Sequence, residues 1–151
     1  MQLGVFIVLM IAAGAMIAFQ SPINAALARS LGVYNATFVS FAVGVVIAGV
    51  IAAVSGGAGS LRQVGQVPWW QWLGGALGVA YVTTIIVAVP RIGVTTMMVA
   101  ALAGQLATAM LIDHFGWFGI EPRPVEMRRL LALPLLAAAL WLIHSADRAP
   151  S

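Results

Sequence analysis

The chain has 151 residues, of which 62% are hydrophobic and only 7% are charged, and its mean hydropathy is +1.05. A soluble domain carries about a quarter charged residues, so this composition excludes a soluble protein and indicates an integral membrane protein. The net charge of +3 comes from arginines scattered between apolar runs, which excludes a nucleic-acid interface. The absence of cysteine excludes disulfides and cysteine-ligated metals.

Long apolar runs without an alternating pattern predict an all-α membrane protein. A helix needs about 20 apolar residues to cross a bilayer. By this criterion the chain forms a single membrane domain, 1–151, with five transmembrane helices at residues 3–27, 36–54, 69–89, 92–112 and 127–144. The first run is longer than the core of a signal peptide and follows no basic residue, which predicts a retained span.

The fifth span rests on the shortest run. Its uncharged part, Leu130–Ile143, is only 14 residues long, a length also typical of an interfacial helix. Met127 and the long side chains of Arg128 and Arg129 can extend it to the bilayer surface. Pro134 lies in its first turns, where neighbouring helices can absorb a kink.

Proline and glycine mark the other boundaries. Pro90 and Arg91 are predicted to end the third span. The connection to the fourth span is then so short that the two spans must form an antiparallel hairpin. The segment Ser55–Ser60 reads SGGAGS and lacks the lysine and hydroxyl of a phosphate-binding loop, so it is predicted to be a flexible loop. Pro22 is predicted to kink the first span.

Arginine is almost evenly divided between the two sides of the membrane. Five spans place four on the side of the N-terminus and three on the other: Arg62, Arg123, Arg128 and Arg129 against Arg29, Arg91 and Arg148. Orientation follows such a bias. A difference of one predicts a chain that inserts both ways.

Polar side chains inside the spans are few, and three groups, one of which includes Met98 on the same face, are candidates for a site. Such residues are costly in lipid and usually face a cavity or a partner helix. They are therefore either hydrogen-bonding contacts between helices or, as we predict, substrate-binding residues, with Pro22 as a hinge. The groups are Gln20, Ser21 and Asn24 on the first span, Tyr81 and Thr84 on the third, and Met98, Gln105 and Thr108 on the fourth.

Charged residues are absent from the middle of every span. Asp113 and His114, at the end of the fourth span, are the one titratable pair near a membrane border. They serve either as structural anchors or, in the functional interpretation, in gating or proton coupling. No nucleophile–base, zinc-protease or phosphate-binding motif is present. The sequence therefore predicts no enzyme, no cofactor and no metal site.

Three segments carry a resemblance to a known family: GAMIAFQSPINAALARSLG at Gly14–Gly32, ATFVSFAVG at Ala36–Gly44 and LIDHFGWFG at Leu111–Gly119. With them, nearly the whole chain resembles the YdcZ-like half-size members of the drug/metabolite transporter superfamily. The last span departs from that pattern because it lacks glycine. The chain also lacks the first-span glutamate of small multidrug-resistance transporters, which argues against exchange of quaternary cations.

The resemblance implies a multi-pass protein of the bacterial cytoplasmic (inner) membrane. Full-length members of the superfamily have ten helices in two inverted halves, so a half-size chain is expected to form an antiparallel homodimer or a heterodimer with a sister chain. The expected function is export of a small, neutral or weakly polar metabolite by alternating access. The alternative is a non-transporting accessory or assembly subunit of a membrane complex. The expected partners are thus the lipid bilayer, a second half-size chain and a small-molecule substrate, with no nucleic acid.

Overall fold

The computed structural model of the chain describes residues 2–146, and every regular element in this range is helical. Arg148, which enters the arginine count above, lies outside the described residues. Five helices are long and apolar enough to cross a membrane. The structure thus fits the prediction of an all-α membrane protein, and the helix at the short fifth run is also long enough to span.

The long helices begin and end close to the predicted borders. They are α1 (Gln2–Leu31), α2 (Val33–Val54), α3 (Leu73–Ile92), α4 (Val94–Phe115) and the pair α5 (Met127–Leu130) and α6 (Ala132–Ala146). Short 3-10 helices join them: η1 (Gly57–Gln66), η2 (Trp69–Trp72) and η3 (Trp117–Gly119). The glycine-rich segment predicted as a flexible loop is thus largely the 3-10 helix η1.

Glycine, rather than proline, ends the third span, and here the prediction was wrong. Pro90 lies inside α3, which continues to Ile92. A proline so close to a helix end removes only one backbone hydrogen bond. The chain turns at Gly93, whose φ of 75° and ψ of 165° favour glycine. Gly32 joins α1 to α2 with nearly the same angles, φ 79° and ψ 162°.

Pro134 explains why the last span is divided in two. A proline at this position cannot donate a hydrogen bond to the carbonyl of Leu130, and its ring crowds that carbonyl. The helix is interrupted next to this point, at Leu131, which separates α5 from α6. The Leu131 amide still bonds to the Met127 carbonyl at 3.1 Å, so the two pieces continue as one span.

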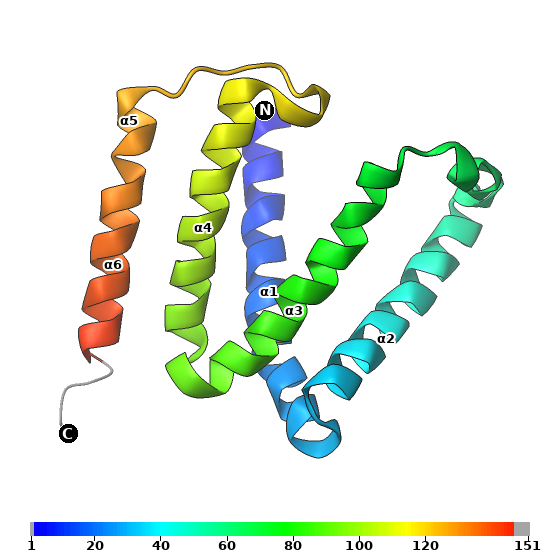
Figure 1. The fold of residues 1–151 in the computed structure, drawn as a ribbon, viewed down its shortest axis with the longest axis horizontal. Coiled ribbons are helices and arrows are strands. Elements are labelled where there is room, and N and C mark those ends of the chain that lie inside the picture. The colour runs from blue at the N-terminus through cyan, green and yellow to red at the C-terminus, as the bar shows by residue number, and fades with distance from the viewer. Residues whose placement is uncertain (1, 147–151) are drawn as a thin grey trace. The chain divides into compact units, whose positions relative to one another are not determined.

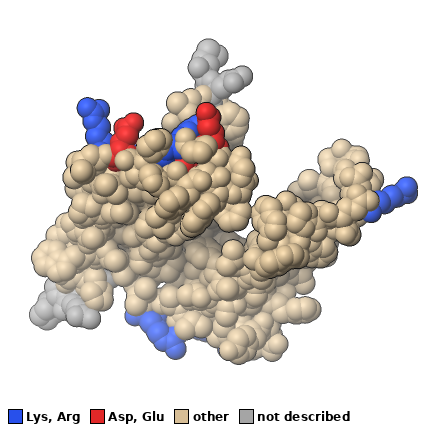
Figure 2. Space-filling view, turned by 45° about the horizontal axis from the view of Figure 1, so that its top comes forward, with Lys and Arg blue, Asp and Glu red and all other residues tan. Residues whose placement is uncertain are grey.

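The chain divides into two compact units, Met1–Arg91 and Ile92–Ser151, and each is described by itself. In the first unit α1 packs against α2, and in the second α4 packs against α6 (Figure 1). On the face drawn in Figure 2, charged side chains occupy only a few places. Large apolar side chains are exposed along every span, as expected of helices that have lipid as their solvent.

Helices α2 and α3 contact each other through side chains in the N-terminal half of α2. The Thr37 and Thr83 hydroxyls lie 3.2 Å apart, and each also donates to a carbonyl of its own helix, at 3.0 Å for Thr37 and 2.8 Å for Thr83. A turn further on, the ring of Phe41 packs over Gly78, where an added Cβ would lie 3.6 Å from the ring. A small residue at Gly78 is therefore part of this helix contact.

We predict that Gly78→Leu destabilises the first unit, because the added branches would enter the space of the Phe41 ring. Overpacking of this kind costs about 1–3 kcal/mol. The matched control is Gly74→Leu, one turn away on the same helix, where an added Cβ meets nothing within 4 Å. Equilibrium unfolding in mixed micelles measures both variants. Equal losses for the two would contradict the contact.

Candidate functional site

The polar cluster of α1 lies on a helix that runs unbroken through Pro22. The Ser21 hydroxyl donates to the Ile17 carbonyl at 2.8 Å, and Ser21 is almost completely buried, with 2% of its surface exposed. Pro22 leaves the carbonyl of Ala18, not that of Ile17, without its usual amide donor. The Ser21 hydroxyl therefore does not replace the bond that Pro22 removes.

A cavity of about 200 Å³ opens between α1 and α3, inside the first unit. Its wall brings together residues from two of the predicted groups with three apolar side chains. The lining residues are Ile17, Gln20, Ser21, Asn24, Tyr81, Val82 and Ile85. The cavity wall thus combines two amides, a hydroxyl and a phenol with aliphatic surface and carries no charged group.

Asn24 is the most unusual member of this wall. Only 5% of its surface is exposed, and its amide has no hydrogen-bond partner among the described residues. In the same part of the chain, no completely enclosed side-chain nitrogen or oxygen is unpartnered. Both amide atoms of Asn24 therefore keep some exposed surface, on a residue that lines the cavity. A buried amide without a partner is costly, and so this one is a candidate ligand-binding group.

Only one of the two residues predicted on the third span lines the cavity. Tyr81 is half-buried and lines the cavity, whereas Thr84 is exposed, and its hydroxyl donates to the Ala80 carbonyl at 2.8 Å. Thr84 is therefore not part of the cavity wall. Reasoning from the sequence missed Ile17, Val82 and Ile85, since nothing distinguishes an aliphatic cavity residue in a chain that is aliphatic almost throughout.

The fourth-span group belongs to the other unit. Met98 is half-buried on α4, and Gln105 and Thr108 are exposed on the same helix. Their role as substrate-binding residues stays a prediction.

Asp113 and His114 have different partners. The Asp113 carboxylate lies 3.7 Å from the Arg129 guanidinium, and its backbone carbonyl accepts a hydrogen bond of 2.7 Å from the amide of Arg123. The His114 ring instead meets the edge of the Phe115 ring, 4.9 Å away. Asp113 thus connects the end of α4 both to the segment that leads to α5 and to α5 itself. The ion pair is partly exposed, so its net stabilisation is small, about 0–1 kcal/mol.

The same segment turns sharply at Gly116. This glycine caps α4 in the left-handed conformation, with φ 64°, and a Cβ there would lie 2.6 Å from Pro122 Cγ. Phe118 also has a positive φ, 61°, which is rare for an aromatic residue. These contacts make the connection a compact turn over the end of α4.

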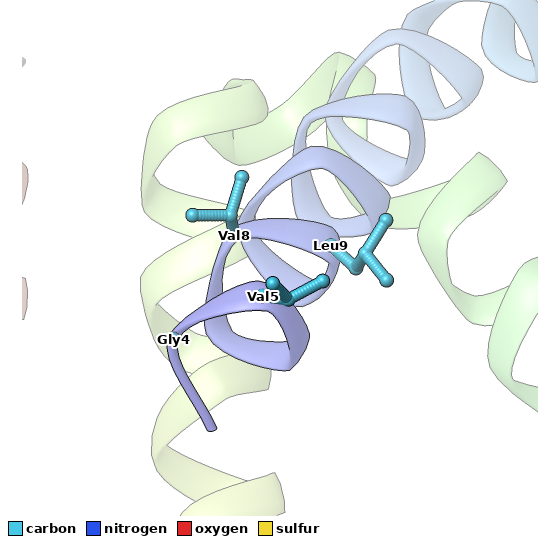
Figure 3. Close-up of a pocket in the computed structure, with 4 residues that line it drawn as sticks. All are labelled: Gly4, Val5, Val8 and Leu9. Carbon is cyan, nitrogen blue, oxygen red and sulfur yellow. The ribbon is translucent and has the colours of Figure 1, made fainter. Parts of the chain in front are cut away.

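Two other hollows of the described residues, both on α1, are lined by apolar residues alone. Shallow notches lie on the first turns of α1, and all the side chains that line them come from that one helix (Figure 3). Gly4 makes the notch of Figure 3, between Val5, Val8 and Leu9. Such apolar notches suit lipid chains or another helix. Among the described residues, no group of three or more His, Cys, Asp or Glu could hold a metal ion.

Comparison with known families agrees with the architecture. Residues 5–142, which include nearly all of the five spans, match the family described as "Putative inner membrane exporter, YdcZ". The chain belongs to this family. No curated protein and no solved structure matches it. Membership of the YdcZ family confirms the resemblance described above, and with five apolar helices it identifies a multi-pass inner-membrane protein of an exporter family.

Proposed function

We propose that this YdcZ-family chain is a half-transporter that exports a small neutral or weakly polar metabolite, with the cavity between α1 and α3 as part of its substrate site. The observation that carries the proposal is the unpartnered amide of Asn24, almost completely buried yet facing a cavity. A residue that served only to join helices would have its hydrogen bonds satisfied by the neighbouring helix. The Asn24 amide in this small cavity suits a ligand that supplies its hydrogen-bond partners.

The proposal includes an antiparallel dimer working by alternating access, in which two five-helix chains form a ten-helix inverted-repeat unit. Two observations support it. The first half of α1, from Leu3 to Phe19, exposes nearly all its large side chains, and Gly14 and Ala18 give its surface a small-xxx-small pair suited to close helix packing. The even distribution of arginine is compatible with opposite insertion of two copies. Pro22, beside the cavity, is the proposed hinge.

An accessory subunit of a membrane complex is the rival. Such a protein also needs apolar surfaces and small-residue pairs, but it has no use for a cavity with an unsatisfied amide. Ligand binding therefore separates the two functions.

We predict that Gln20→Ala and Asn24→Ala leave expression and dimer formation near those of the parent protein but abolish stabilisation by ligand. Binding raises apparent stability by mass action, so a thermal-shift screen of neutral metabolites finds the ligand first. Pro22→Ala should retain binding while slowing exchange in proteoliposomes. If the amide variants unfold or lose dimerisation with ligand affinity intact, the cluster serves helix packing, and the transport proposal loses its site.

We predict dual insertion. A single cysteine at Ser60, exposed in η1, should react with an impermeant thiol reagent in intact cells in part of the molecules, and in the rest only after the membrane is opened. Two arginines added to one side should fix a single orientation. Labelling from one side only, in a functional protein without a sister chain, would contradict the antiparallel homodimer.

A gating or proton-linked role is proposed for Asp113 and His114. We predict that Asp113→Asn changes the pH dependence of transport more than it changes folding, because the partly exposed pair with Arg129 contributes at most about 1 kcal/mol. The measurement is the rate of exchange against pH, with unfolding as the second readout. Identical pH profiles in variant and parent would leave Asp113 with a structural role alone.

A further inference from the structure

We infer that the cavity between α1 and α3 recognises a carboxamide or urea group on a small, uncharged molecule. This inference rests on the proposed function and adds to it the chemical class of the substrate. Three properties of the cavity carry it: the free amide of Asn24, the absence of charge and the small volume.

Hydrogen bonding points to an amide. The Asn24 side chain offers an acceptor oxygen and, beside it, a donor NH2 group, and both are without partners among the described residues. A carboxamide or urea presents the complementary pair side by side and satisfies both at once. A ketone supplies an acceptor only, and it would leave the Asn24 oxygen unpaired. Sites of this kind reject analogues that leave a buried polar group unsatisfied.

The lack of charged side chains in the cavity wall argues against charged ligands that have the shape of an amide. A carboxylate has the shape of a carboxamide, but the cavity wall contains no arginine, lysine or histidine to pair with it. It contains no acid to pair with an ammonium group either. Moving an unpaired charge into such a site is far more costly than moving a neutral amide.

Volume limits the size of the ligand. Drug-sized molecules occupy cavities of roughly 300–1,000 Å³, and this one measures about 200 Å³. Ile17, Val82 and Ile85 supply aliphatic surface for a short apolar body. The cavity therefore suits a short aliphatic amide and is too small for a multi-ring drug.

The test uses the full-length protein in lipid nanodiscs and probes of matched size. Butyramide, 2-pentanone and butyrate have equal numbers of non-hydrogen atoms and differ in the polar group alone. We expect saturation-transfer NMR to give butyramide an affinity at least about tenfold above the other two, the effect of one unsatisfied buried group. N-phenylbenzamide, an amide too large for the cavity, should not compete with it.

Variants then locate the binding. Asn24→Leu should weaken butyramide binding by about tenfold or more, whereas Asn35→Leu, the same change at an exposed asparagine of α2 outside the cavity, should leave it unchanged. If Asn24→Leu fails to fold, the comparison of the probes on the parent protein still decides. Equal affinity for amide and ketone, preference for butyrate, or unchanged binding in Asn24→Leu would overturn the inference.

Failure of the inference and failure of the proposed function give different results. Asn24-dependent binding of butyramide without exchange of any bound compound across proteoliposomes would refute transport and leave the recognition of amides standing. Asn24-dependent stabilisation by a metabolite that has no amide or urea group, together with its transport, would refute the substrate class and leave the function standing.

Discussion

Satisfaction of backbone hydrogen bonds in lipid is the constraint on which this structure depends. Hydrocarbon offers a peptide group no water, so the chain crosses it as helices, and even proline is accommodated with little interruption of the span. Pro22 and Pro90 lie inside continuous helices, and Pro134 divides the last span only into two consecutive pieces. Side-chain hydroxyls follow the same rule, because Ser21, Thr37 and Thr83 all donate to carbonyls of their own helices. Against this background the unpartnered amide of Asn24 is conspicuous.

Sequence reasoning succeeds here where one physical quantity dominates. Apolar length alone predicts the five helices, because no other element of that length can cross a bilayer. Boundaries are harder. Pro90 was predicted to end α3, but the turn is made at Gly93, where a positive φ is needed. A proline removes one backbone hydrogen bond and need not end a helix, whereas a residue with a positive φ changes the direction of the chain. The sequence alone does not show which of the two residues ends α3.

The candidate site was only partly predictable, and for a different reason. Polar residues in an apolar chain stand out, which is why Gln20, Asn24 and Tyr81 could be chosen before their positions were known. Nothing in the sequence distinguishes their aliphatic neighbours in the cavity from the other aliphatic residues of the chain. The sequence also does not show which residue pairs with a charged group at the surface. Adjacency suggested Asp113 and His114 as a pair, but consecutive residues on a helix point in different directions. Asp113 instead lies near Arg129, after an intervening turn that sequence spacing does not specify.

The contact between Thr37 and Thr83 has a consequence for how α3 sits on α2. Three hydrogen bonds are within reach of the two hydroxyls, one to each helix and one between them, but two hydroxyl groups carry only two protons. Any two of the three bonds can form at one time, so several arrangements of equal bond number exist. The contact between the two helices is therefore compatible with more than one arrangement of hydrogen bonds. The two threonines thus join α2 to α3, the helix that also forms one wall of the cavity, without requiring one fixed set of hydrogen bonds.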